Sequence, residues 1–307
     1  MQHFITINDI RSDEFHRILE LSASIKQQVK RGEYQHYLAN KMLAMVFEKQ
    51  SLRTRVSFET GMFQLGGSST YLGNEIGFGK RESIKDIAEV LSSMVDVIMF
   101  RGMKHQSVED LARYSAVPVI NGLTDSAHPC QALADMFTLR EIFGDLRGKK
   151  LSWVGDANNV AASLLQASAR LGVKFSVAAP SGYQFDSNVI SNLIGDGAAE
   201  GFDLELTDDP FKAVKNAIAV YTDVWVSMGQ EAEEEERKKI LSPYQVNAEL
   251  MAAAGHNAIF LHCLPARRGL EVTDEVMDSS QSKVIQQAEN RLHAQKGLLV
   301  WLLNETR

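Results

Sequence analysis

The chain is poor in cysteine: its 307 residues include only Cys130 and Cys263, which do not stand in a CxxC spacing. Two isolated cysteines exclude a disulfide framework. The first residues, Met1 to Phe4, lack the basic and apolar segments of a signal peptide. We therefore expect the protein in a reducing compartment, the cytoplasm.

Long apolar runs and an excess of basic residues are also missing. No run reaches the roughly 18 apolar residues that a membrane span needs, so we expect no membrane association. The net charge of −7 argues against general nucleic-acid binding, but a cleft can be locally positive and bind a small anion. The main charge cluster, Glu233 to Lys239, places its acids before its bases, which is typical of a solvated helix face.

Two nucleotide-binding patterns are absent as well. The segment Gly155 to Asn159 follows an expected strand but lacks the GxGxxG spacing of dinucleotide-binding proteins. The segment Gly73 to Arg81 contains a Gly-Lys pair, but Arg81 stands where a P-loop has serine or threonine. No His/Cys/Asp/Glu cluster has the spacing of metal ligands. We expect neither a cofactor nor a metal.

Strand-like and helix-like segments alternate along almost the whole chain, which predicts an α/β fold of two domains, each a mostly parallel sheet flanked by helices. A polar break near 144–150 suggests a domain of 1–143, with a C-terminal helix of about 286–307 packed back onto it, and a domain of 144–285. Ligands bind such sheets beyond the carboxyl ends of the strands. The active site is expected in the cleft between the domains. The expected strands are 42–47, 97–100, 117–121, 151–155, 173–179, 203–206, 217–222 and 258–263.

The first group of candidate site residues follows the first of these strands. A helix is expected to begin at Ser51, with Arg53 and Arg55 in its first turn, where the helix dipole disfavours cations. A bound anion would compensate, although both could be surface arginines paired with nearby acids. Ser51-Leu52-Arg53-Thr54-Arg55 resembles the phosphate-binding motif Ser-Thr-Arg-Thr-Arg of the aspartate/ornithine carbamoyltransferase family. Leu52 replaces its usual threonine.

A second group lies at the ends of two later strands. Arg101 ends one of them, and His128 and Gln131 are three residues apart at a helix start, so both can face one ligand. An imidazole there can polarise a carbonyl, and a glutamine oxygen can accept from an NH2 group. His128-Pro129-Cys130-Gln131 is similar to the family's carbamoyl-binding motif.

A third group is His262-Cys263-Leu264-Pro265, at the end of a strand. A nucleophilic Cys/His pair is disfavoured because adjacent strand residues point to opposite faces. The segment resembles the family motif in which the cysteine contacts the acceptor amine and the leucine carbonyl holds the carbamoyl NH2. Arg291 alone would be an ordinary helix-surface arginine; the resemblance implies that it reaches the carbamoyl group.

The acceptor is indicated by Asp223-Val224-Trp225-Val226-Ser227-Met228-Gly229, which resembles the Asp-x-x-x-Ser-Met-Gly loop of the ornithine-specific branch of the family. An aspartate can pair with an ammonium group, although the segment could also be an ordinary surface turn. The resemblance implies an ornithine site of Asn159, with Asn158 as second choice, and of Asp223, Ser227 and Met228.

The resemblance runs in order from Asp9 to Arg291 and implies transfer of a carbamoyl group from carbamoyl phosphate to ornithine, in arginine metabolism, by a homotrimer or a multiple of it. Gly77 departs from the family, whose loop often carries a polar residue that reaches the neighbouring subunit. The alternatives are a carbamoyltransferase with another acceptor such as putrescine, a dinucleotide-dependent oxidoreductase and a non-catalytic subunit.

The resemblance also implies which residues form the site. The implied catalytic residues are Arg101, His128 and Cys263. The implied carbamoyl phosphate contacts are Ser51, Leu52, Arg53, Thr54, Arg101, His128, Gln131, Cys263, Leu264 and Arg291.

Overall fold

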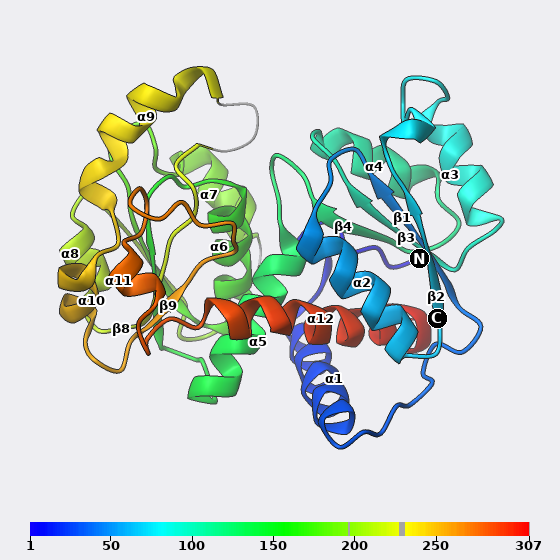
Figure 1. The fold of residues 1–307 in the computed structure, drawn as a ribbon, viewed down its shortest axis with the longest axis horizontal. Helices are drawn as coiled ribbons and strands as arrows, with labels where there is room; N and C mark the ends of the chain where they lie inside the picture. Colours follow the sequence, from blue (N-terminus) through cyan, green and yellow to red (C-terminus); the bar gives the residue numbers. More distant parts are fainter. Residues whose placement is uncertain (196, 227–230, 307) are drawn as a thin grey trace. The chain divides into compact units, whose positions relative to one another are not determined.

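A computed structural model of the chain describes residues 1–195, 197–226 and 231–306 (Figure 1). The chain divides into two compact units, one of Met1–Phe137 with Glu289–Arg307 and one of Thr138–Ala288. Each unit contains one parallel β-sheet flanked by helices, which confirms the predicted fold class. Every helix in the described part of the chain is too short or too polar to cross a membrane.

The first unit is built on a four-stranded parallel sheet in the order β2-β1-β3-β4. Phe47 of β1 lies opposite Arg101 of β3, so the carboxyl ends of these strands are neighbours. Apolar side chains of the strands, among them Val46, Ile98 and Val119, form its core with residues of the covering helices. The elements are α1 (Ser12–Lys30), β1 (Met42–Phe47), α2 (Leu52–Gln64), β2 (Ser68–Leu72), α3 (Ile84–Ser92), β3 (Val97–Arg101), α4 (His105–Tyr114), β4 (Val119–Leu123) and the start of α5 (Pro129–Phe143), with short 3-10 turns at Ile7–Asp9 and Asn74–Ile76.

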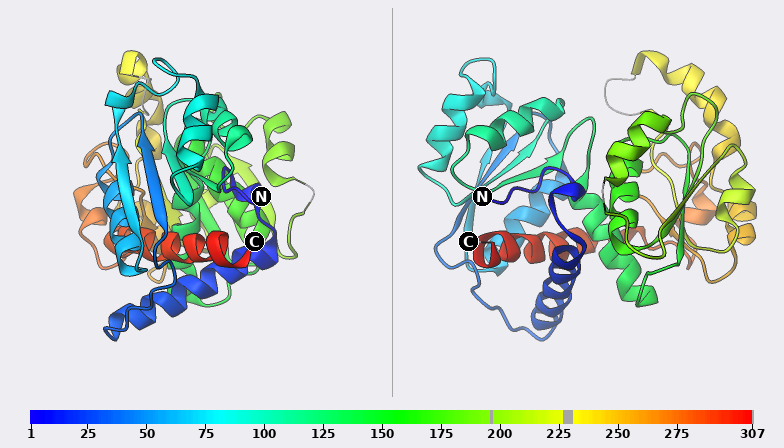
Figure 2. Two further views of the ribbon diagram at one scale, coloured as in Figure 1. Left: turned by 90° about the vertical axis from the view of Figure 1, so that its right-hand side faces the viewer. Right: turned by 180° about the vertical axis from the view of Figure 1, so that it is seen from behind.

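The C-terminal helix α12 (Val284–Val300) returns to the first unit and ends in a π-helical turn, Trp301–Glu305. Helix α1 passes below α12 in both views of Figure 2, and it runs across the direction of α12 in the right-hand view. Lys26 of α1 donates a hydrogen bond of 2.6 Å to Asn290 of α12. A Cβ atom at Gly297 would lie 2.7 Å from the Ile18 carbonyl oxygen, so glycine is what permits this close approach.

The second unit is built on a five-stranded parallel sheet in the order β7-β6-β5-β8-β9. Its core joins Val154, Val220 and Phe260 of the strands to Leu250 and Val276 of the helices. The elements are β5 (Lys150–Val154), α6 (Asn159–Leu171), β6 (Lys174–Ala178), α7 (Ser187–Ile194), β7 (Asp203–Thr207), α8 (Pro210–Val214), β8 (Ala217–Tyr221), α9 (Glu234–Leu241), α10 (Ala248–Ala254), β9 (Ile259–Leu261) and α11 (Asp274–Met277), with 3-10 turns at Glu231–Glu233 and Ser242–Tyr244.

Two strand predictions need correction. β4 begins at Val119 rather than at 117, because Pro118 has no backbone N–H to donate to a neighbouring strand. β9 ends at Leu261 rather than at Cys263, because the chain turns out of the extended conformation at Leu264, whose φ is 59°. His262 and Cys263 therefore lie beyond the strand, in a segment without the strict alternation of β-structure.

Candidate active site

The start of α2 carries the first cluster of predicted site residues. Ser51 is the N-cap of this helix, and its hydroxyl accepts a 3.3 Å hydrogen bond from the backbone N–H of Thr54. The Thr54 hydroxyl in turn accepts from Ser51 and from Nη1 of Arg101, both at 3.1 Å. The paired ends of β1 and β3 thus bring Arg101 to the first turn of α2, where N–H groups and a guanidinium can bind an anion.

Positive charge gathers around a buried histidine in the same unit. Burial is the main cause that lowers the pKa of His128 well below its usual value, and Arg291, Arg101 and Arg53 lower it further, in that order. Because the pKa is lowered, the imidazole is neutral at pH 7. Three guanidinium groups close enough to influence one imidazole form a region suited to a small, doubly charged anion.

Buried hydrogen bonds hold the residues at the start of α5. Arg291 donates from Nη1 to Oε1 of Gln131 at 2.7 Å, and Gln131 donates from Nε2 to Asp135 at 2.8 Å. All three side chains are buried. The buried carboxylate of Asp135 therefore balances part of the Arg291 charge through the amide of Gln131. The amide is oriented before any ligand binds.

Two residues of the predicted phosphate motif point elsewhere. Arg55 pairs with Glu59 at 2.9 Å and stacks on the ring of Tyr71, so the description as a surface arginine paired with a nearby acid is correct for this residue. Leu52 is the first residue of α2, and 74% of it is exposed. At that helical position a backbone N–H is available to an anion whatever the side chain, which explains how leucine can replace threonine.

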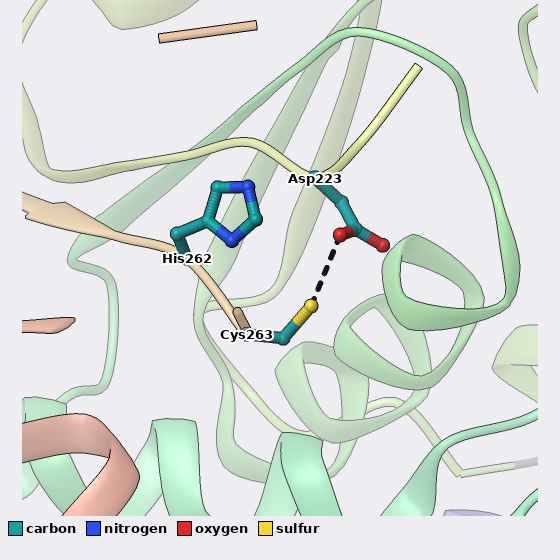
Figure 3. A group of neighbouring side chains, drawn as sticks. All are labelled: Asp223, His262 and Cys263. Carbon is teal, nitrogen blue, oxygen red and sulfur yellow. Dashed lines mark hydrogen bonds between the residues drawn. The ribbon is translucent and has the colours of Figure 1, made fainter. Parts of the chain in front are cut away.

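The second unit holds a separate cluster around Asp223, which follows β8 (Figure 3). Its Oδ1 accepts hydrogen bonds from the Cys263 thiol at 3.0 Å and the backbone N–H of Val224 at 2.8 Å. Its Oδ2 accepts from Nδ2 of Asn158 at 2.8 Å. The Oδ1 atom of Asn158 caps α6 by accepting from the N–H groups of Val160 and Ala161. Asn158, the second choice of the sequence analysis, is therefore the residue that orients Asp223, and Asn159 is the first residue of α6.

Within the described part of the chain, Asp223, His262 and Cys263 each offer one potential metal ligand atom, and these atoms lie within 4.8 Å of one another (Figure 3). The sequence analysis missed this grouping because the residues come from two segments. Both ring nitrogens of His262 already take part in hydrogen bonds, to Glu271 and to the backbone of Leu264. While His262 keeps these hydrogen bonds, Asp223 and Cys263 are the two members of the group that remain as metal ligands. Zinc sites have three or four protein ligands.

Arg237 contradicts the predicted solvated face of the charge cluster at 233–239. Its side chain is buried, forms an ion pair with Asp156, donates from Nε to the Trp225 carbonyl at 2.6 Å and stacks on the ring of Tyr183. Burial raises the pKa of Asp156, against the opposing effect of Arg237. A charged residue inside an acidic-basic run gives no sequence signal of such a role. Ser227 and Met228, predicted to bind ornithine, lie outside the described residues.

The structure is that of a two-domain α/β protein with a cluster of guanidinium groups in one unit and a carboxylate oriented by hydrogen bonds in the other. A model described as the carbamoyl-P binding domain of aspartate/ornithine carbamoyltransferase matches residues 2–141, and one described as the Asp/Orn binding domain matches residues 147–302. The chain belongs to the aspartate/ornithine carbamoyltransferase family.

Two relatives that match this chain over nearly their whole length are named as ornithine carbamoyltransferases. An ornithine carbamoyltransferase of Caldicellulosiruptor saccharolyticus is 48% identical over 98% of this chain and 98% of its own length. An anabolic ornithine carbamoyltransferase of Pyrococcus furiosus is 50% identical over 97% of this chain and 95% of its own length. The solved structure of the ornithine carbamoyltransferase from Pyrococcus furiosus superimposes with a TM-score of 0.95 at 49% identity and covers 100% of this chain and 98% of that chain.

The two thiols should differ in reactivity. Burial raises the pKa of Cys130 to about 12, so at pH 8 its thiolate fraction is about 10⁻⁴, whereas Cys263 is only half-buried. We expect a disulfide reagent such as DTNB to label one thiol of the native protein quickly and both thiols after denaturation. Native Cys263→Ala protein should show no fast phase. A fast phase in that variant would mean that Cys130 is accessible as a thiolate.

Proposed function

We propose that this chain transfers the carbamoyl group of carbamoyl phosphate to the δ-amino group of L-ornithine, giving L-citrulline and phosphate. The observation that carries the proposal is the cluster at the start of α2, where Arg101 donates a 3.1 Å hydrogen bond to the Thr54 hydroxyl and where Arg53, Arg101 and Arg291 all lower the pKa of the buried His128. Family membership and the name shared by the full-length relatives support it. The matched descriptions associate the first domain with carbamoyl phosphate and the second with the amino acid.

In this proposal the first unit binds carbamoyl phosphate through the start of α2. The phosphate accepts hydrogen bonds from Ser51, Thr54, the backbone of Leu52 and the guanidinium groups of Arg53 and Arg101. The carbonyl oxygen accepts from His128 and Arg101, which stabilise the negative charge that develops on it. Gln131 accepts from the carbamoyl NH2, and Arg291, which donates to Gln131, fixes the carbamoyl plane. The carbonyl oxygen of Leu264 is a second acceptor for this NH2 group.

The second unit binds the acceptor. Asp223 and Cys263 orient the δ-amine, and Asn159, Asp223, Ser227 and Met228 hold the α-amino and α-carboxylate groups. The deprotonated amine attacks the carbonyl carbon and forms the new C–N bond. The bond from that carbon to the bridging oxygen then breaks, and phosphate leaves with the electron pair and takes up the proton that the nitrogen loses. An acyl phosphate is already activated, so positioning and electrostatic stabilisation supply what the step needs, and the proposal includes no cofactor.

We propose that the reaction belongs to arginine biosynthesis and takes place in the cytoplasm. Citrulline formation of this kind serves arginine biosynthesis, and the relative from Pyrococcus furiosus is named as anabolic. The cytoplasm is the proposed location, since both Cys130 and Cys263 are free thiols.

The phosphate site is tested by a pair of arginine variants. Arg53→Ala should lower the affinity for carbamoyl phosphate by at least about 100-fold, because charge-assisted hydrogen bonds to the dianion are lost. Arg55→Ala is the matched control: its side chain is committed to Glu59 and Tyr71, so the affinity should change less than about threefold. Isothermal titration calorimetry measures both. Tight binding by Arg53→Ala would reject the phosphate site.

The acceptor is tested by citrulline formation with ornithine beside lysine, aspartate and putrescine. Ornithine should be preferred, and Asp223→Asn should lower kcat/KM for ornithine by at least about 100-fold, because a buried ammonium loses its charged partner. Asp208→Asn, at an exposed carboxylate of the same unit, is the control and should leave kcat/KM unchanged. Preference for putrescine would favour the alternative carbamoyltransferase, and an unchanged Asp223→Asn variant would remove Asp223 from the site.

We also propose a homotrimer, or a multiple of it. One face of α2 exposes Leu52, Val56 and Phe63, of which 74%, 50% and 80% are accessible in the single chain. Apolar side chains spaced along one helix face are suited to cover by a neighbouring subunit.

Light scattering should give three times the chain mass or a multiple of that value. Phe63→Asp should shift the mass towards the single chain, because a charge on a buried interface is costly. Phe211→Asp, on α8 of the other unit, is the control and should leave the mass unchanged, because Phe211 stands alone on its short helix and does not belong to a row of exposed apolar side chains. A monomeric wild-type protein would refute the trimer.

A further inference from the structure

The buried pair His262 and Glu271 lies next to the proposed acceptor site but is not used in the mechanism above. Both side chains are 0% exposed, and Nε2 of His262 lies 3.2 Å from Oε1 of Glu271. The same Oε1 accepts a 2.6 Å hydrogen bond from the backbone N–H of Arg267. Neither side chain reaches solvent. Among the described residues, Oε2 of Glu271 is buried and has no hydrogen-bond partner, so the contacts of Oε1 and of the two ring nitrogens decide the role of the pair.

The other ring nitrogen of His262 points to the backbone two residues further along the chain. Nδ1 accepts a 2.9 Å hydrogen bond from the N–H of Leu264. Leu264 has a φ of 59°, in the left-handed region that a leucine adopts only when its surroundings enforce it. The backbone N–H of His262 itself donates to Oε1 of Gln287 at 3.0 Å, which anchors the start of the turn. Gln287 thus binds the backbone at the start of the turn, and the ring of His262 binds it at Leu264.

The partners fix the protonation of the ring. A nitrogen that accepts a hydrogen bond from a backbone N–H must carry its lone pair, so Nδ1 bears no proton. A neutral imidazole then carries its proton on Nε2, which donates to Glu271. Glu271 thereby selects the tautomer that leaves Nδ1 as an acceptor. This is how a carboxylate orients the imidazole of a metal-binding or catalytic histidine, but here the oriented group is a turn of the backbone.

We propose that Glu271 and His262 are positioning residues that hold the left-handed turn at Leu264. The turn directs the Cys263 thiol to Asp223 and presents the carbonyl oxygen of Leu264. This inference deepens the proposed function, on which it rests, because Cys263 and Leu264 contact substrates only in that mechanism. His262 acts through Leu264 and not on the reacting atoms. A buried ring with both nitrogens engaged can neither exchange protons with a substrate nor bind a metal without losing the turn.

Two substitutions of His262 separate its two hydrogen bonds. Asparagine places an oxygen near the position of Nδ1 and can still accept from the N–H of Leu264. Glutamine places an amide near the position of Nε2 and can still donate to Glu271, but leaves the Leu264 N–H without its acceptor. Loss of the turn displaces substrate-contacting groups, and a displacement of about 1 Å typically lowers the rate about 100-fold.

We therefore expect kcat of His262→Gln to fall about 100-fold, with the KM for carbamoyl phosphate nearly unchanged, and kcat of His262→Asn to stay within about tenfold of wild type. Circular dichroism and thermal unfolding identify any variant that fails to fold. Equal losses in both folded variants, or a greater loss in His262→Asn, would overturn the proposal, because the ring would then act by filling space or by binding Glu271 alone.

Glu271 offers a second matched pair. Glu271→Gln keeps an oxygen that can accept from Nε2–H and from Arg267, whereas Glu271→Ala removes it. Glu271→Gln should retain more activity than Glu271→Ala, by about tenfold or more. The reverse order, or equal activities, would show that Glu271 does not set the tautomer.

A measurement independent of activity separates this inference from the proposed function. In protein with ¹⁵N-labelled histidine, the His262 resonances, assigned by their loss in His262→Asn, should show an unprotonated Nδ1 and a protonated Nε2 at neutral pH. A protonated Nδ1 would reject the inference even if citrulline forms. Wild-type protein that shows the expected tautomer but forms no citrulline would instead reject the proposed function.

Discussion

Positive charge held beside the start of α2 is the constraint on which the proposed chemistry depends. Arg53, Arg101 and Arg291 all act on the buried ring of His128, and like charges brought together in a poorly solvated region repel one another. The parallel pairing of β1 with β3 enforces this arrangement, because it places Arg101 opposite Phe47, a few residues before the helix. A dianion relieves the repulsion, so the free energy of folding that maintains the cluster also prepares the binding of the ligand.

The neutral state of His128 follows from the same charges and gives the ring a defined task. A protonated imidazole would add a fourth positive charge to the cluster; a neutral one supplies a directed N–H donor without that repulsion. In the proposed mechanism Arg101 therefore supplies the charge that stabilises the developing oxyanion, and His128 supplies an oriented N–H hydrogen bond. The buried chain from Arg291 through Gln131 to Asp135 fixes the neighbouring acceptor. Charge and orientation are thus provided by different residues.

The sequence predicted the framework well where the pattern is local. The strand Met42–Phe47 is a continuous apolar run, so both of its ends were found, and the helix after Ser51 carries its own capping residue, so its start was found. The edge strand Ser68–Leu72 was missed because it is polar and half-exposed, without a buried apolar run. Arg237 was misread because only its partners reveal its burial, and these lie outside the charged run, Trp225 12 residues and Asp156 81 residues earlier in the chain.

The acceptor site illustrates the same limit in more detail. The amide oxygen of Asn158 is occupied in capping α6, so only its NH2 group remains to bind Asp223. The carboxylate is then held from one side by a helix cap and from the other by the Cys263 thiol. Neither contact follows from spacing, since Asp223 and Cys263 meet only because β8 and β9 are neighbours in the sheet. In the proposed function, an incoming ammonium competes with the weak thiol donor of Cys263 for Oδ1 of Asp223, and the hydrogen bond from Asn158 to Oδ2 keeps the carboxylate oriented.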